Sequence, residues 1–169
     1  KVGKLAAEQQ PELEKVFRQL HANPELAFDL HDTSALVAKR LKKLGYRVHT
    51  GIAETGLAAV LKNGDGPVIM FRSDMDALPV KEESGLSYAS KKQVTLDDGS
   101  SQYVSHACGH DAHTAWLLGI AKVMMETRDS WSGTLVLVGQ PAEELIAGAQ
   151  AMVDDGLYDK VPEPSLLIS

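Results

Sequence analysis

The sequence contains little cysteine, no long apolar run and fewer basic than acidic residues. Cys108 is the only cysteine among 169 residues, which excludes an internal disulfide framework. No run of about 18 apolar residues is present, so the sequence predicts no membrane-spanning helix. No basic start is followed by an apolar segment, so no signal peptide is visible. We therefore expect a cytoplasmic protein, with a processed exported chain carrying one thiol as the alternative.

The charge balance argues against a nucleic-acid-binding protein. Asp and Glu number 23 against 17 Lys and Arg, a net charge of −6, whereas nucleic acid requires a basic face. Apolar residues make up 44% and charged residues 24%, which is typical of a soluble globular domain. The chain begins at Lys1 without Met and ends after Leu166–Ile168, which reads as a buried strand. We therefore expect it to be a piece of a longer protein.

Hydrophobic periodicity predicts helices that alternate with apolar strands. Leu13, Val16, Phe17 and Leu20 recur at helical spacing, for example. The predicted helices cover residues 6–22, 33–44, 112–128 and 147–154; the predicted strands cover 46–51, 56–61, 67–71, 134–138 and a segment from about 165. Residues 81–105 are polar and predict a loop or a short hairpin with a turn at 97–100. This alternation predicts an α/β fold, a three-layer sandwich with a largely parallel mixed sheet.

Two features of the predicted strands bear on a site. Residues 63–66 read Asn-Gly-Asp-Gly, a strong turn signal that predicts a hairpin between the strands at 56–61 and 67–71. The apolar run Val68–Phe71 predicts a strand that is buried on both faces. Polar residues follow this strand and the strand at 134–138, at the carboxyl ends where α/β sheets bind ligands.

The block from His106 to His113 is the most informative segment. It holds three of the six histidines and the only cysteine. In an extended segment Cys108 and His110 point to the same side, so both could reach one cation, and a thiolate with an imidazole suits zinc. One alternative is a buried cysteine beside polar loop histidines. The other is a nucleophilic Cys108–His110 pair, which nearby carboxylates disfavour because they raise the thiol pKa.

Two pairs of carboxylates follow the predicted strands. Glu143 and Glu144 repel each other beside an apolar core, and a cation resolves this conflict: one could bind metal while the other acts as general base. The alternative is a solvated acidic turn at a helix start. Asp74 and Asp76 could bind metal or hold a ligating histidine; the alternatives are a turn before Pro79 or an ion pair with Arg72.

Four motifs together resemble a known family. They are His21–Leu26 (HANPEL), Phe71–Pro79 (FRSDMDALP), His106–Thr114 (HACGHDAHT) and Gln140–Glu144 (QPAEE). In this order and spacing they resemble the M20 metallopeptidases, in particular the amidohydrolase branch of hippurate hydrolases, auxin-conjugate hydrolases and N-acyl-amino-acid amidohydrolases. The resemblance implies a zinc-exopeptidase-like catalytic domain, of which residues 1–169 would be the amino-terminal part.

The resemblance also implies roles for individual residues. Cys108, His110 and Glu144 match metal ligands, Glu143 matches the general base, and Asp76 matches an acidic residue that supports the metal centre. The side chains that would hold the ligands in place or contact substrate are Asp74, His106, Asp111 and His113. The implied cofactors are two divalent metal ions, zinc or manganese, with nickel or cobalt as alternatives. The implied reaction is hydrolysis of N-acyl amino acids by a metal-activated water.

The chain departs from the family pattern in one respect. The family takes two further histidine ligands from beyond the Glu-Glu motif, whereas His21, His31 and His49 all precede it. The resemblance places those ligands beyond Ser169, together with a lid domain through which the full-length protein would form a homodimer. We therefore expect the 169 residues alone to be inactive. The competing classes are a metal-binding module without chemistry, disfavoured by Glu143, and a cysteine hydrolase that would resist chelators.

Overall fold

The computed structural model describes residues 1–96 and 98–169 as a mixed α/β fold. The helices are α1 (Val2–Ala22), α2 (His31–Lys43), α3 (His110–Glu126), the short 3₁₀ helix η1 (Arg128–Ser130), α4 (Gly148–Asp154) and α5 (Leu157–Lys160). The strands are β1 (Arg47–Ile52), β2 (Gly56–Asn63), β3 (Val68–Asp74), β4 (Gln93–Thr95), β5 (Ser101–Tyr103), β6 (Gly133–Gln140) and β7 (Leu166–Ile168). Within the described residues, no helix is both long and apolar enough to cross a membrane.

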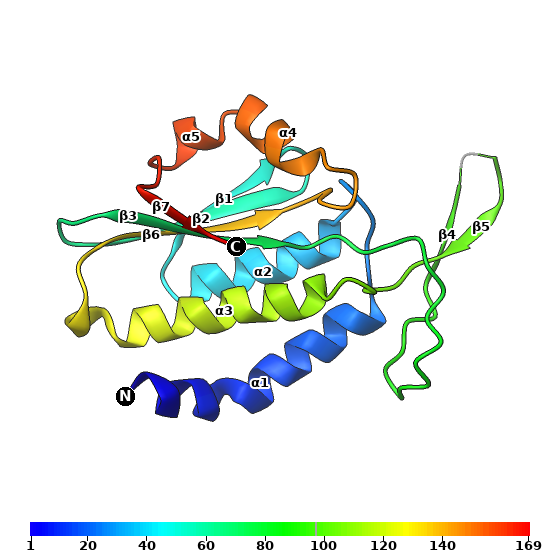
Figure 1. Cartoon of the computed structure of the whole chain (residues 1–169), viewed down its shortest axis with the longest axis horizontal. Helices are drawn as coiled ribbons and strands as arrows, with labels where there is room; N and C mark the ends of the chain where they lie inside the picture. Colours follow the sequence, from blue (N-terminus) through cyan, green and yellow to red (C-terminus); the bar gives the residue numbers. More distant parts are fainter. Residues whose placement is uncertain (97) are drawn as a thin grey trace.

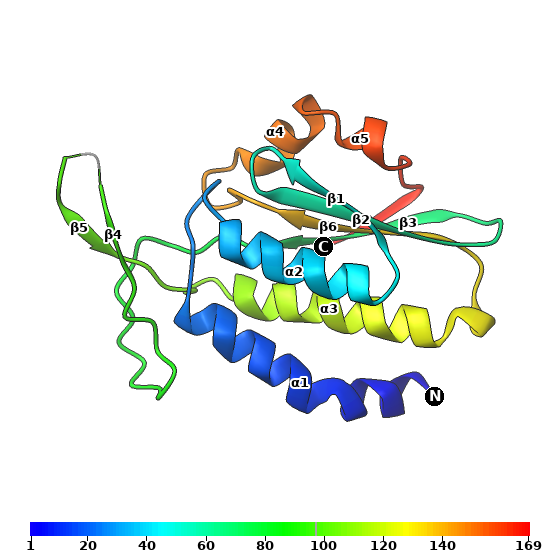
Figure 2. The same cartoon turned by 180° about the vertical axis from the view of Figure 1, so that it is seen from behind.

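A five-stranded mixed sheet separates two groups of helices, which confirms the predicted fold class. The strand order is β1-β2-β6-β3-β7; β6 and β7 run parallel to β3, whereas β1–β2 and β2–β6 are antiparallel. Helices α2 and α3 lie on one face, with α1 packed against α3, and α4 and α5 lie on the other (Figures 1 and 2). Helix α3 connects the parallel strands β3 and β6, so their carboxyl ends share one edge of the sheet.

The predicted hairpin between β2 and β3 is wrong. The turn at residues 63–66 is present, but β6 lies between the two strands and hydrogen-bonds to both. Val136, on β6, is fully buried and pairs with Val60 on one side and Met70 on the other. Burying the apolar β6 at the centre of the sheet removes more apolar surface from water than a direct β2–β3 contact would.

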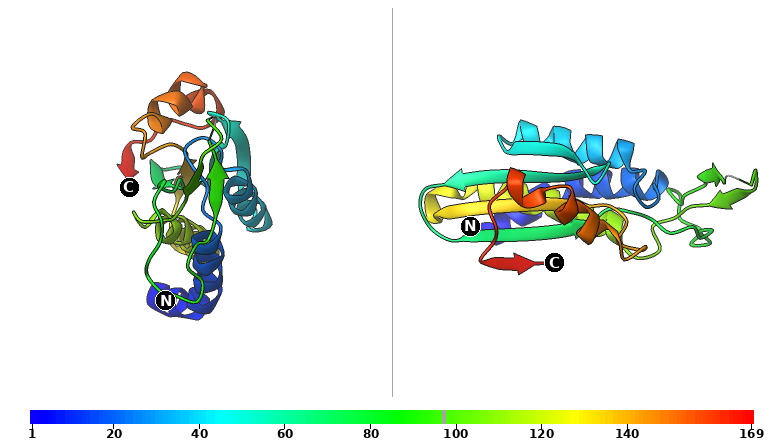
Figure 3. Two further views of the ribbon diagram at one scale, coloured as in Figure 1. Left: turned by 90° about the vertical axis from the view of Figure 1, so that its right-hand side faces the viewer. Right: turned by 90° about the horizontal axis from the view of Figure 1, so that it is seen from above.

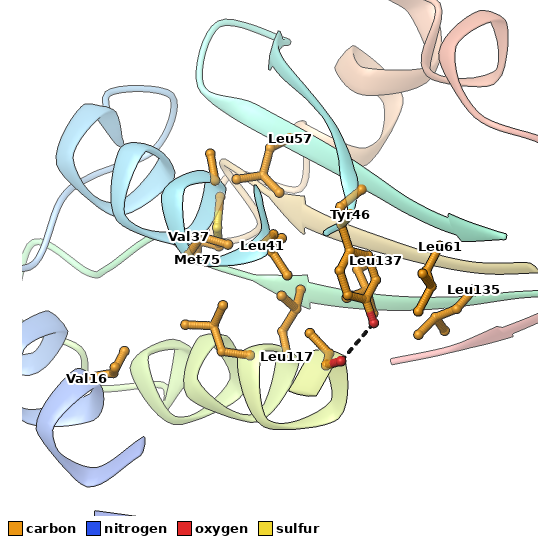
Figure 4. Close-up of a cluster of buried hydrophobic side chains, with 14 of the residues drawn as sticks. Val16, Val37, Leu41, Tyr46, Leu57, Leu61, Met75, Leu117, Leu135 and Leu137 are labelled. Atoms are coloured by element: carbon orange, nitrogen blue, oxygen red, sulfur yellow. Dashed lines mark hydrogen bonds between the residues drawn. The ribbon is translucent and has the colours of Figure 1, made fainter. Parts of the chain in front are cut away.

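The larger core lies between the sheet and helices α1–α3 (Figure 4). Leu41 of α2, Leu117 of α3 and Leu137 of β6 are fully buried there. Tyr46 is also buried, and its hydroxyl donates to the carbonyl of Ala121 at 2.9 Å, which satisfies its polar group. This core fixes α3 against the sheet and thereby sets the position of its first turn.

The outer edge of the sheet is more exposed than predicted. Within β3 only Met70 of the run Val68–Phe71 is fully buried, and the side chains of β7 are about half exposed, at 53%, 50% and 47% for Leu166, Leu167 and Ile168. The expected full burial of these strands is therefore wrong for this chain. The reason is that β7 is short and pairs with β3 alone among the described strands.

Residues 81–96 and 98–105 form an arm that projects beyond the edge of the sheet (Figure 3). Its tip is the predicted short hairpin, in which β4 and β5 pair antiparallel from Gln93–Tyr103 to Thr95–Ser101. Of the predicted turn at 97–100, Asp97 lies outside the described residues, and the Asp98 side chain accepts hydrogen bonds from Ser100. The arm ends at Ser105, which forms an isolated antiparallel bridge with Leu78 immediately before the His106–His113 block.

Candidate metal centre

The predicted site residues meet at the carboxyl ends of β3 and β6. Asp74, the last residue of β3, pairs in register with Gln140, the last residue of β6, and Met75 N–H donates to the Gln140 carbonyl at 3.0 Å. The chain segment 25–27 lies across this edge, because Ala77 N–H donates to Glu25 O and Ala142 N–H to Ala27 O. The polar residues after each strand are thus held by backbone hydrogen bonds, which fixes where their side chains begin.

Two overlapping groups of side chains have the spacing of a metal site. Cys108, His110 and Glu144 form one group, and Asp74, His110 and Glu143 form the other; within each group the candidate ligand atoms lie within 4.8 Å of one another. His110 Nε2 lies 3.7 Å from oxygens of Asp74 and Glu143 and 3.8 Å from Glu144 Oε1. The structure therefore brings Cys108 and Glu144, the other ligands predicted within this chain, and the predicted general base Glu143 close to the His110 imidazole.

Cys108 and His110 converge by a different route from the one predicted. The segment is not extended: Gly109 adopts a left-handed φ of 82°, and α3 begins at His110. The turn at Gly109 rather than strand alternation brings both side chains to the same side. A left-handed φ strains any residue that carries a Cβ, so glycine suits this position.

Asp76 holds His110 and the glutamate loop in place by hydrogen bonds. Its carboxylate is fully buried and accepts the backbone N–H of Glu143 at 3.0 Å and of Glu144 at 3.1 Å. His110 Nδ1 lies 2.7 Å from the Asp76 carbonyl, which orients the ring so that Nε2 faces the ligand group. Burial acts to raise the pKa of Asp76, but hydrogen bonds from His110 and the two backbone N–H groups outweigh it and lower the pKa. The carboxylate is therefore ionised at neutral pH.

Asp74 already has partners within the protein. His113 Nδ1 lies 2.5 Å from Asp74 Oδ1, and Arg72 Nη1 lies 3.2 Å from Oδ2. The Arg72 ion pair is the alternative that the sequence allowed. Arg72 also donates from Nε to Gln140 Oε1 at 2.8 Å, which ties β3 to β6 beside the site. Sequence reasoning did not find Gln140 as a partner; its place at the end of the second buried strand is the signal that could have shown it.

Glu144 and Cys108 each have a feature that a bound cation would explain. Glu144 Oε1 is buried and has no hydrogen-bond partner among the described residues. Burial raises the pKa of the Cys108 thiol, and the carboxylates of Glu144, Glu143 and Asp74 raise it further. A divalent ion would satisfy the orphaned oxygen and stabilise the thiolate at once, and thiolate, imidazole and carboxylate are zinc-type donors. The side chains of this group therefore fit the metal that the sequence predicts.

The pKa of His110 is raised by carboxylates of the same centre. Burial acts to lower its pKa, but the hydrogen bond with Asp76 and the charge of Asp74 raise the pKa to about 9. In the metal-free chain a protonated imidazole therefore supplies part of the positive charge that these carboxylates require. A bound cation would replace that proton, because only the neutral imidazole binds metal.

His106 lies beside the centre but differs from its neighbours. The residue is 7% exposed, and neither ring nitrogen has a hydrogen-bond partner among the described residues. Burial lowers the pKa of His106 to about 4, so the ring is neutral at pH 7. The structure places it near the site without bringing it into the two ligand groups.

Two residues of the HANPEL segment support the site, although the sequence reading gave them no role. His21 Nδ1 lies 2.6 Å from Asp111 Oδ2, in the first turn of α3. Glu25 is buried and accepts the backbone N–H groups of Asp32 and Thr33, at 3.0 and 2.8 Å, in the first turn of α2. Glu25, outside the helix, thus caps the start of α2 through its side chain. The likeness of this segment to a family motif was the available signal.

The fold and the convergent donors define a metal-binding α/β domain with a glutamate pair at its centre. A family model described as peptidase family M20/M25/M40 matches residues 70–168, and the chain belongs to this family. Hippurate hydrolase of Campylobacter jejuni is 47% identical over 152 residues, covering 89% of this chain and 37% of the relative. N-acetyl-L-cysteine deacetylase of Bacillus subtilis is 41% identical over 145 residues, covering 85% and 33%. The chain therefore spans about a third of the length of these relatives.

A solved structure shows the same architecture. The crystal structure of Bacillus subtilis YxeP, described as a dinuclear metal-binding peptidase of the M20 family, matches with a TM-score of 0.78 and 35% sequence identity. The match covers 89% of this chain and 40% of that one. The zinc-exopeptidase-like fold inferred from the sequence motifs is thereby confirmed.

Proposed function

We propose that this chain forms part of a metal-dependent amidohydrolase that cleaves the amide bond of N-acyl amino acids or related small conjugates. The observation that carries the proposal is the group of Cys108, His110 and Glu144, whose ligand atoms lie within 4.8 Å of one another while Glu144 Oε1 has no partner among the described residues. Glu143 stands beside this group on the same loop. A site built only to hold metal would not require this second carboxylate.

In this proposal Cys108, His110 and Glu144 hold the metal, and Asp76 keeps His110 and the glutamate loop in place. When bound, two divalent ions would polarise the scissile carbonyl and acidify the attacking water. Zinc and manganese fit the donor set, with nickel and cobalt as alternatives.

The Glu143 side chain is 38% exposed and therefore accessible to substrate and water, whereas its backbone is fixed by Asp76. Glu143 would accept the proton of the attacking water and then deliver it to the leaving amine. This role requires a free carboxylate that does not bind metal. Both glutamates approach His110 Nε2, at 3.7 Å for Glu143 and 3.8 Å for Glu144, and the buried Oε1 of Glu144, which has no partner among the described residues, favours that residue as the metal ligand.

The names of the relatives support a proposal for the substrate class, and the family resemblance supports one for the assembly. The relatives named above act on hippurate and N-acetyl-L-cysteine, as their names state, and both compounds join an acyl group to an amino acid. We propose a substrate of this class, and a position for residues 1–169 as the amino-terminal part of the catalytic domain. Further histidine ligands and a lid that forms a homodimer would lie beyond Ser169.

Chelation tests this function in the full-length protein. Hydrolysis of hippurate and of N-acetylated amino acids should be lost after dialysis against a chelator and should return with zinc or manganese. Iodoacetamide treatment of the metal-loaded enzyme provides the comparison with a cysteine hydrolase, since bound metal should protect Cys108. Activity that survives the chelator but not alkylation would overturn the proposal in favour of a Cys108 nucleophile.

A further inference from the structure

The segment from Val104 to Asp111, which carries Cys108 and His110, is held at both ends by hydrogen bonds that meet at His21. His21 lies in the last turn of α1, far from this segment in sequence. Its two ring nitrogens contact two different carboxylates, Asp111 at 2.6 Å and Glu82 at 3.0 Å. Each carboxylate leads to one end of the metal-binding segment.

Asp111 fixes the end at which α3 begins. Its side chain is 2% exposed, Oδ1 accepts the backbone N–H of Ala112 at 2.8 Å, and Oδ2 contacts His21. Asp111 directly follows His110, so its position sets the orientation of the helix turn from which that imidazole projects. Among the described residues, His21 is the side chain that hydrogen-bonds to this buried carboxylate and offsets its charge.

Glu82 leads to the other end of the segment through the base of the arm. Its Oε2 accepts the backbone N–H of Ser90 at 2.5 Å, and the Ser90 hydroxyl donates to the Val104 carbonyl at 2.7 Å. The Glu82 side chain is 9% exposed, so this link is nearly shielded from water. Val104 in turn lies four residues before Cys108.

The His21 ring is itself held in one orientation. Its side chain is 12% exposed and packs against Phe17 and Tyr88, with ring centroids 5.5 and 5.3 Å away. The Arg18 guanidinium carbon lies over the Tyr88 ring, 4.5 Å from its centroid. Both hydrogen-bond partners are carboxylate oxygens, which only accept, so the ring must donate from both nitrogens and carry a positive charge.

We propose that His21 is a positioning residue that clamps the metal-binding segment at both ends and so presets the distance between Cys108 and His110. The inference rests on the proposed metal site. It assigns no contact between His21 and metal or substrate: His21 acts through Asp111 and Glu82. Loss of this clamp should widen the range of Cys108–His110 geometries and weaken metal binding, as loss of partners outside the ligand set does in other metal sites.

Cobalt titration of the full-length protein tests the proposal, because cobalt bound to a thiolate and an imidazole absorbs in the visible and near-ultraviolet. We expect His21→Gln, whose single neutral amide nitrogen can replace only one of the two ring nitrogens, to weaken cobalt affinity about tenfold and to shift the absorption of the bound ion. His21→Arg, which keeps the charge and donors for both carboxylates, should recover part of the affinity. The control is His31→Gln, because His31 is 78% exposed, and it should match the unmodified chain.

The outcomes separate positioning from a merely structural role. If the His21→Gln chain melts at a lower temperature but binds cobalt with unchanged affinity and spectrum when folded, the inference is wrong. Should that variant fail to fold, Glu82→Gln, which leaves the Asp111 link intact, must still shift the bound spectrum, and an unshifted spectrum overturns the inference. Unmodified full-length protein that binds no cobalt overturns the proposed metal site and this inference with it.

Discussion

The backbone N–H of Glu143 donates to the Asp76 carboxylate at 3.0 Å, which ties the loop after β6 to the loop after β3. The second oxygen of Asp76 accepts the N–H of Glu144. One buried side chain therefore places both glutamates of the candidate metal centre, although it joins neither ligand group itself.

Asp76→Asn should weaken both the fold and the metal site. The amide would turn an N–H group toward one of the two backbone donors, so a buried hydrogen bond is lost together with the charge. We expect the free energy of unfolding to fall by about 2–3 kcal/mol and metal affinity to fall by about 10–100-fold. Urea unfolding and metal titration measure these changes. Asp65→Asn, at an exposed position, is the control, and equal behaviour of the two variants would contradict the assigned role.

The two glutamates should separate catalysis from metal binding. In the full-length protein, Glu143→Gln should lower kcat by about 10²–10⁴-fold while the metal content stays unchanged, because only the proton acceptor is lost. Glu144→Gln should lower the metal content itself, because a ligand is removed. Each variant is the control for the other. Full activity of the Glu143→Gln enzyme, measured with metal bound, would refute the general-base role.

The Cys108 thiol should react slowly in the metal-free chain. Burial and the neighbouring carboxylates raise its pKa, so the thiolate fraction at pH 8 is smaller than in an unfolded peptide. The rate of iodoacetamide alkylation as a function of pH reports this pKa, and a peptide of residues 106–113 is the reference. Alkylation should reach half its maximal rate at a higher pH in the folded chain. A lower midpoint than that of the peptide would favour a nucleophilic cysteine.

His106 should make the metal-free fold sensitive to acid. Its pKa of about 4 in the folded chain lies below the value of about 6.5 in an unfolded one, so the unfolded state takes up a proton first. Stability should therefore fall as the pH drops from 6.5 to 4, by up to about 3 kcal/mol. Urea unfolding across this range measures the slope. His106→Phe keeps an aromatic ring without the titration and should flatten the slope; an unchanged slope would contradict the buried neutral histidine.

Gly148 should tolerate no side chain. A Cβ at this position would lie 1.6 Å from the backbone oxygen of Pro141, where the loop carrying Glu143 and Glu144 closes on itself. We expect Gly148→Ala to lower the free energy of unfolding by about 3 kcal/mol and to weaken metal binding, because the loop must open. Gly3→Ala is the matched control, since its Cβ meets nothing within 4 Å and lies in α1. Thermal melting of both variants measures their stability, and equal melting temperatures would contradict the predicted clash at Gly148.

The site could be predicted from the sequence more fully than the strand pairing could. Cys108 and His110 were predicted as ligands from their residue types and spacing, and the family resemblance assigned Glu144 to the metal; the structure brings their ligand atoms within 4.8 Å of one another. The hairpin between β2 and β3 was wrong because a turn signal is local, whereas the insertion of β6 depends on apolar strands about 70 residues apart. The His21–Asp111 contact was missed for a similar reason: nothing near either residue in the sequence specifies a partner 90 positions away.

The central place of β6 also constrains how the chain reaches its native state. β2 and β3 are synthesised first, and each must keep an unpaired edge until residues 133–140 arrive between them. Such long-range pairing is slow, and an open apolar edge invites aggregation in the meantime. Because Glu143 and Glu144 directly follow β6, the cation-binding group can form only after this insertion. Metal uptake should therefore be a late event in folding, and loading with metal should select, by mass action, the molecules whose central strand is in register.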